Sequence, residues 1–144
     1  MVRHAHDLEP GEDVLGAGGH VHHARTIAWF AETCVEGWAT CSVPEAGFVR
    51  PSSNARVIPD ARRPREAIDL LARIRLLSGH AFWPDDLSPT DADATAFARL
   101  VGHRQVTDAH LLTLRVRCGG MVATFDRGLL ELAVGIGAVV ELIP

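Results

Sequence analysis

The chain contains no lysine, so its 14 cationic side chains are all arginines. It has only three cysteines, Cys34, Cys41 and Cys118, which are widely spaced and form no Cys-x-x-Cys pair. An odd, scattered set of this kind argues against a disulfide framework and against a structural zinc site. We therefore expect buried free thiols in a reducing compartment.

Long apolar runs are also absent. No stretch approaches the ~18 uncharged apolar residues of a membrane span, and the first twenty residues lack the apolar block of a signal peptide. With 144 residues, 47% of them apolar, the chain suits one compact domain with one sizeable core. We expect a soluble cytoplasmic protein without a membrane partner.

Positive charge is not in excess, because the net charge is −4. Nothing overall favours a nucleic-acid partner, so phosphate binding needs a local patch or a metal ion. The arginines between residues 62 and 75 are typical of a solvated face, with contact to RNA phosphate as the alternative. Trp29, Trp38 and Trp83 are interpreted as packing residues, with base stacking as the alternative.

The chain changes character near residue 20. Residues 1–19 have neither helical nor strand periodicity and are interrupted by glycine and proline, which indicates an irregular segment. In residues 20–144, apolar patterns and turn signals alternate in units of helix or strand length. This second part is expected to form the packed domain.

The periodicity of residues 20–144 predicts alternating helices and strands. Helices are expected at residues 22–36, from Pro44 to the loop at 51–54, around 67–77, and at 88–101, 107–118 and 127–134. Strands are expected at residues 38–43, 80–83, 121–125 and 138–143. This alternation indicates an α/β fold with a mostly parallel sheet.

Three acidic residues fall where such a fold places its ligands, beyond the carboxyl ends of the strands. Asp126 directly follows the strand at 121–125, Glu45 comes two residues after the strand at 38–43, and Asp108 opens a buried helix. Acids gathered at one edge repel one another unless a cation neutralises them, and Mg²⁺ or Mn²⁺ suits carboxylate ligands. The alternative is that each acid is a helix cap or a surface residue.

The block TDAHLLTLRVRCGGMVATFDRGL, residues 107–129, resembles the carboxyl-terminal signature of PIN-domain ribonucleases of the VapC toxin type. The resemblance continues upstream through HVHHARTIAWF, GWATCSVPEAGFVR and HAFWPDD, and so covers residues 20–144. It implies a PIN-like α/β/α sandwich with a mostly parallel sheet. It also implies Mg²⁺-dependent cleavage of single-stranded RNA, silencing by a cognate antitoxin, and a homodimer.

The resemblance also assigns roles to residues. It implies that Glu45, Asp108 and Asp126 are catalytic acids that hold the metal, and that the hydroxyl of Thr124 orders the strand end before Asp126. Members of this family are expected to begin with an apolar central strand that ends in a first acid. Here that stretch is polar, so the strand is expected to be missing or replaced, and Asp7 is the candidate first acid and metal ligand, with Asp13 as the other choice.

Two explanations of residues 1–19 stay open. Either they come from a shifted reading frame or a misjudged start, or the protein is a degenerate member of the family. Both predict weak or absent nuclease activity, because the site would hold three assured acids instead of four. Both also predict an unstable chain, because the centre of a parallel sheet needs an apolar strand. The alternative function is a catalytically dead PIN-like domain that binds antitoxin or RNA as a decoy or regulator.

Overall fold

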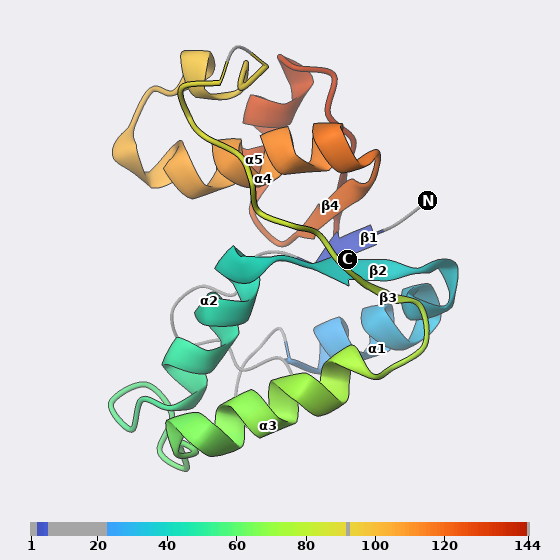
Figure 1. Ribbon diagram of the computed structural model, residues 1–144, viewed down its shortest axis with the longest axis vertical. Coiled ribbons are helices and arrows are strands. Elements are labelled where there is room, and N and C mark those ends of the chain that lie inside the picture. The colour runs from blue at the N-terminus through green and yellow to red at the C-terminus, as the bar shows by residue number, and fades with distance from the viewer. Residues whose placement is uncertain (1–2, 6–22, 92, 144) are drawn as a thin grey trace.

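The computed structural model describes residues 3–5, 23–91 and 93–143, and their strands form one parallel sheet (Figure 1). The strands are β1 (Arg3–Ala5), β2 (Trp38–Thr40), β3 (His80–Phe82), β4 (Met121–Thr124) and β5 (Val140–Leu142). Their order across the sheet is β3-β2-β1-β4-β5, and every neighbouring pair is parallel. The α/β class expected from the sequence is therefore confirmed.

Helices cover both faces of this sheet. The α-helices are α1 (His23–Thr33), α2 (Ser42–Ser52), α3 (Pro64–Arg75), α4 (Val106–Cys118) and α5 (Arg127–Val134). Short 3-10 helices lie at η1 (Cys34–Glu36), η2 (Phe97–Arg99) and η3 (His103–Gln105). Figure 1 shows α1, α2 and α3 on one side of the sheet and α4 and α5 on the other, which is the α/β/α arrangement expected of a PIN-like fold. Within the described residues, no helix has the length and apolarity that a membrane crossing requires.

The centre of the sheet corrects the sequence-based expectation for residues 1–19. Residues Arg3–Ala5 are not irregular, because they form β1 between β2 and β4, with His4 opposite both Ala39 and Val122. The polar sequence RHA therefore replaces the expected apolar strand. Three residues are too few to show a period, whereas two strand edges can satisfy the backbone groups of a short strand. The domain boundary at residue 20 stays a prediction, since residues 6–22 are not described.

Helix α4 supplies most of the core on its face of the sheet. Leu112 packs with Val122 of β4 and Leu129 of α5, whereas Leu111 and Leu114 pack in a second cluster on the β2 side. These leucines are at most 1% exposed. The wide apolar face predicted for this helix is confirmed, and the free energy from burying each leucine is about 1.5–3 kcal/mol.

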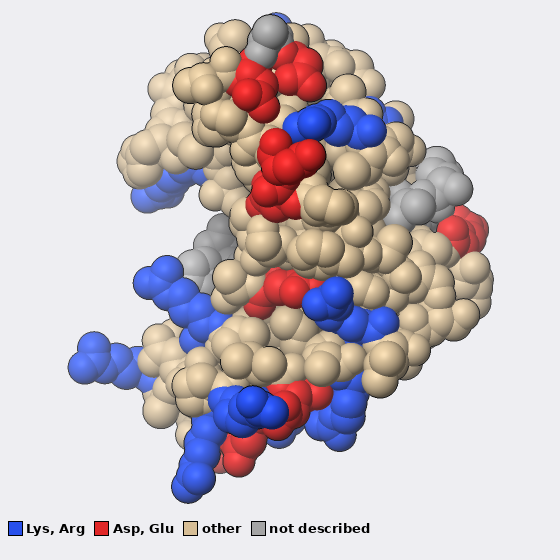
Figure 2. All heavy atoms as spheres, viewed as in Figure 1, with Lys and Arg blue, Asp and Glu red and all other residues tan. Residues whose placement is uncertain are grey.

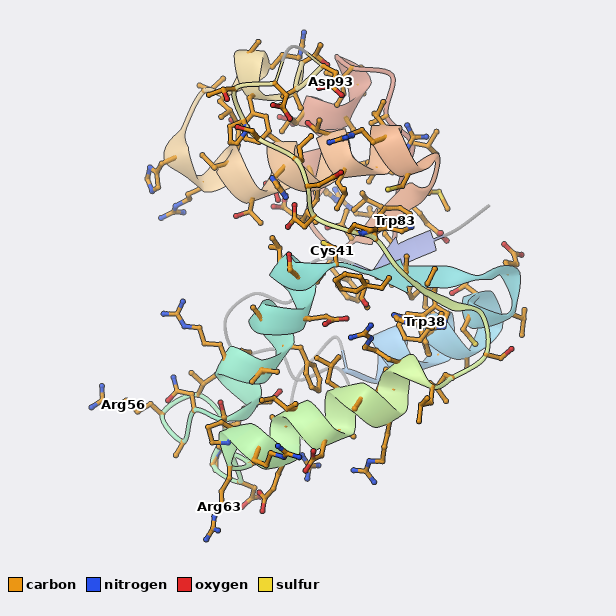
Figure 3. All side chains as sticks on the ribbon, viewed as in Figure 1. Trp38, Cys41, Arg56, Arg63, Trp83 and Asp93 are labelled. Atoms are coloured by element: carbon orange, nitrogen blue, oxygen red, sulfur yellow. The ribbon has the colours of Figure 1, made fainter. Side chains whose placement is uncertain are left out.

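The tryptophans serve as core residues, as predicted. Trp29 of α1 packs against Ala123 of β4, and the ring of Trp38 meets Phe30 edge-on at a centroid distance of 5.0 Å. Trp83 packs in the cluster beneath α4. Figure 3 shows Trp38 and Trp83 on opposite sides of the sheet. Because all three are only 5–6% exposed, none presents a face to a base.

The helix predicted at residues 88–101 does not form. The Asp91 carboxylate accepts from the Ser88 backbone N–H at 2.9 Å, which is half of the expected capping box. Only the 3-10 turn η2 follows. The Ser88 hydroxyl instead bonds Thr90, and such local side-chain bonds favour a turn over a helix here. Helix propensity does not explain the outcome, because alanine, the best helix former, recurs at positions 94, 96 and 98.

Gly79 is the glycine on which the entry into β3 depends. Its φ is +83°, and a Cβ atom there would lie 2.9 Å from the Cys34 carbonyl oxygen and 3.2 Å from the Cα of Gly37. We predict that Gly79→Ala lowers the free energy of unfolding by about 1–3 kcal/mol, measured by urea denaturation. The matched control is Gly47→Ala, inside helix α2 with nothing within 4 Å of the new Cβ. It should raise stability by about 0.5–1 kcal/mol. Equal stability of the Gly79→Ala variant and the unaltered chain would contradict the prediction.

Candidate active site

The three predicted acids lie where helices start beside the sheet. Strand β2 leads directly into α2, which carries Glu45 in its first turn, and β4 leads into α5, which Asp126 caps. Since β2 and β4 flank β1, their carboxyl ends flank the end of β1. Asp108 occupies the first turn of α4. A negative side chain at each position is favoured by the positive end of a helix dipole.

Asp126 is fixed by two short hydrogen bonds. Its Oδ1 accepts from the Gly128 backbone N–H at 2.7 Å, and its own N–H donates to the buried Thr124 hydroxyl at 2.9 Å. The predicted role of Thr124 in ordering this strand end is thus confirmed. Asp126 is otherwise exposed, and Oδ2 makes no hydrogen bond within the described part of the chain.

Glu45 is held from two sides. The Thr40 hydroxyl donates to Oε1 at 2.6 Å. The Arg75 guanidinium lies with Nε at 3.3 Å from Oε1 and donates from Nη1 to Oε2 at 3.4 Å. The side chain of Glu45 is 16% exposed. This paired geometry fixes the carboxylate far more tightly than a surface position does.

Asp108 is half-buried, and the preceding residue, Thr107, lines a small pocket of about 160 Å³. The pocket lies between the start of α2, the loop before η2 and the first turns of α4. Its walls are mostly apolar, with a threonine and a histidine from α4; the lining residues are Val43, Pro89, Phe97, Val106, Thr107 and His110.

Asp85 joins the helices that carry two of the acids, and the sequence analysis missed it. It accepts from the Ser42 hydroxyl at 2.7 Å and is paired with His110 Nε2 at 2.7 Å. Ser42 begins α2 and His110 lies in α4, so Asp85 ties the helix of Glu45 to the helix of Asp108. The same strand-end rule that selected Glu45 and Asp126 could have selected Asp85, because it follows the end of β3 by three residues.

The described residues contain no group of three or more His, Cys, Asp or Glu close enough to hold a metal ion. Glu45, Asp108 and Asp126 thus share one edge without converging on one point. Asp7 and Asp13 lie outside the described residues. The donor chemistry nevertheless fits, because Mg²⁺ binds through only one or two protein carboxylates and keeps several waters.

The cysteines are free, as predicted, but only Cys41 is buried; Cys34 is half-buried and Cys118 is exposed. Burial is the main cause that raises the pKa of the Cys41 thiol to about 11. A thiol that stays protonated at neutral pH is a poor nucleophile and a poor metal ligand. Cys41 is therefore a packing residue beneath α4.

Arginines gather near the edge of the sheet at which Glu45 and Asp126 lie. Figure 2 shows the molecule hollowed on the left of the view, between α2 and the segment that leads into α4, with arginine side chains on both sides. Exposed arginines of these segments are Arg50 and Arg104. In the cluster at residues 62–75 the interpretation as a solvated face holds for Arg62, Arg63, Arg65 and Arg73, which are exposed. Arg75 is the exception, because it pairs with Glu45.

No family model matches the chain, but several curated proteins of Mycobacterium tuberculosis do. Ribonuclease VapC38 of strain H37Rv is 48% identical over 119 residues, which cover 83% of this chain and 82% of that protein. Ribonuclease VapC39 is 44% identical over 124 residues, covering 83% and 86%, respectively. Ribonuclease VapC44 is 40% identical over 115 residues and 80% of each chain.

The Asp85 link gives a stability prediction. We expect Asp85→Ala to lower the free energy of unfolding by about 1–3 kcal/mol, because His110 loses its partner in a mostly buried setting and the exposed Ser42 hydroxyl also loses one. Guanidinium denaturation measures the change. The control is Asp93→Ala, an exposed acid 4.0 Å from Arg117, for which a loss of no more than about 1 kcal/mol is expected. An Asp85→Ala loss as small as that of the control would show that the link contributes nothing.

Proposed function

Because this chain belongs to the VapC family of ribonucleases, we propose that it is a metal-dependent endoribonuclease toxin that hydrolyses RNA phosphodiester bonds. One observation carries the proposal: β1 occupies the centre of the sheet, so the acids after β2 and β4 stand on either side of its end. The proposal includes neutralisation by a cognate antitoxin, action in the cytoplasm, and a homodimer.

Glu45, Asp108 and Asp126 are the described residues that would hold Mg²⁺ or Mn²⁺. Asp7 completes the proposed set, because it comes two residues after Ala5, the last residue of the central strand. Such a cation, when bound, lowers the pKa of a coordinated water and stabilises negative charge that develops on the phosphate. Carboxylates at a shared edge supply the hard oxygen ligands this chemistry needs.

The residues of the chain itself would orient the substrate and the water. Glu45, fixed by Arg75 and Thr40, offers a rigid acceptor for a water proton. Exposed arginines attract the RNA backbone: Arg50 and Arg104 lie in the segments beside the recess, and Arg127 follows Asp126 directly. This local positive charge allows an RNA substrate even though the net charge is −4.

The position of β1 weakens the case for the weak or absent nuclease activity expected from the sequence. That expectation rested on a missing central strand and on a missing first acid. β1 fills the strand position with a polar segment, and Asp7 follows that strand by two residues in the sequence. The stronger proposal is therefore an enzyme. The alternative, a catalytically dead domain that binds RNA or antitoxin, is an outcome of the test below.

The test measures cleavage of a fluorescent single-stranded RNA by the purified, antitoxin-free 144-residue chain. We predict Mg²⁺-dependent cleavage that EDTA abolishes, and a loss of at least about 100-fold in Asp108→Asn and Asp126→Asn, since each substitution removes a carboxylate from a charge-stabilising site. Asparagine also caps helices well, so Asp126→Asn removes the charge while it keeps the start of α5. Asp7→Asn should lose activity similarly, whereas Asp13→Asn should not.

The control substitution is Asp93→Asn, at an exposed acid in the segment before η2, and this variant should cleave like the unaltered chain. Intact RNA together with retained RNA binding by the unaltered chain would refute the enzyme proposal and favour the binding domain. Cleavage that persists in EDTA and in both aspartate variants would refute the metal-dependent mechanism.

A further inference from the structure

Arg75 departs from the other arginines of its helix. It lies in the last turn of α3, thirty residues from Glu45 in sequence, yet its guanidinium meets both oxygens of the Glu45 carboxylate. Arg73, in the same turn, is exposed and makes no ion pair among the described residues. The contact to Glu45 is therefore particular to position 75.

The Arg75 guanidinium is itself held in place. Its central carbon lies 4.9 Å from the centroid of the Phe82 ring, at the end of β3. A planar guanidinium over an aromatic face gains cation–π attraction and loses rotational freedom. Arg75 thus presents its nitrogen atoms to Glu45 from a restricted set of conformations.

Thr40 fixes the same carboxylate from the strand side, and His80 fixes Thr40. A hydroxyl has one proton to donate, and Thr40 donates it to Glu45 Oε1 at 2.6 Å. The 2.8 Å contact between Thr40 Oγ1 and His80 Nε2 must therefore have His80 as the donor. Burial, and next the charge of Arg75, lower the pKa of His80, which favours the neutral ring. A neutral ring that donates from Nε2 leaves Nδ1 without a proton.

A carboxylate offers about four lone-pair sites. The Thr40 hydroxyl and the Arg75 Nη1 group occupy two of them on Glu45, one on each oxygen, and Arg75 Nε lies 3.3 Å from Oε1 as an ion-pair contact. Glu45 therefore keeps lone pairs for a further ligand while its two oxygens are already oriented. We propose that Arg75 and Thr40 are positioning residues that hold the Glu45 carboxylate for its work at the metal site, an inference that rests on the proposed function.

A purely structural tie between α3 and α2 is the competing explanation, and the two make different predictions. If the contact between Arg75 and Glu45 only stabilises the packing of α3 on α2, its loss lowers the melting temperature and leaves the reaction of the folded protein unchanged. A positioning role changes kcat and metal affinity in protein that is still folded, because loss of groups that orient a metal ligand typically costs 10–100-fold in either quantity.

The experiment compares the full chain with Arg75→Gln, Thr40→Val, Thr40→Ser and, as the matched control, Arg73→Gln. We predict that Arg75→Gln and Thr40→Val each lower kcat for RNA cleavage, and weaken Mn²⁺ binding followed by electron paramagnetic resonance, by about 10–100-fold, with KM for RNA unchanged. Thr40→Ser keeps the hydroxyl and should restore the values of the unaltered chain. Arg73→Gln removes the same charge from the same helix turn and should change neither.

Arg75→Lys serves if Arg75→Gln does not fold, since lysine keeps the charge but loses the two-pronged geometry, and should give intermediate values. Arg75 and Thr40 variants with unaltered kcat and Mn²⁺ affinity, and with only a lower melting temperature, would overturn the inference and leave the proposed function standing. Absence of metal-dependent cleavage by the unaltered chain would overturn the proposed function, and the Mn²⁺ comparison would still test the role of Arg75 and Thr40.

Discussion

The parallel pairing of β1 with both β2 and β4 is the constraint on which the site depends. Neighbouring strands lie about 4.8 Å apart, so β1 sets the ends of β2 and β4 roughly 10 Å from each other. Glu45 follows one of these ends and Asp126 caps the helix after the other. Without a strand between them, the two acids would have no defined separation. A three-residue polar segment therefore determines the geometry of residues more than thirty positions away.

Sequence patterns correctly predicted those helices whose ends are set by residues within or next to the helix itself. Helix α5 has the predicted bounds, residues 127–134, because Asp126 caps it and its apolar face is continuous. Gly119 ends α4 at a φ of 70°, as expected of a glycine after a helix. The failures have other causes. β1 exists only through pairing with strands distant in sequence. At residues 88–101 half of the predicted capping box forms, but the alanine-rich segment after it makes only a 3-10 turn, so propensity and capping did not decide its structure.

In the candidate site, too, residues placed by a local rule were predicted, and residues that depend on contacts across the fold were not. The strand-end rule placed Glu45 and Asp126 from the sequence, because the rule needs only the position of each strand. It could not identify Arg75, since nothing in an arginine-rich helix distinguishes the one residue that meets a carboxylate thirty positions earlier. His110 was missed for a similar reason, because its partner Asp85 lies twenty-five residues away on a different element. Partners across the fold become visible only when the helices are placed.

The structure also changes the account of how repulsion among the three acids is offset. Clustered carboxylates repel one another, and a cation was the neutralising agent inferred from the sequence. The structure supplies compensation of its own: Arg75 pairs with Glu45, the Gly128 N–H meets Asp126, and all three acids stand at the amino-terminal ends of helices. Each helix end contributes about half a positive charge in the first turn. The acids can therefore share one edge of the folded chain without a cation between them, so the fold does not depend on the proposed metal ion.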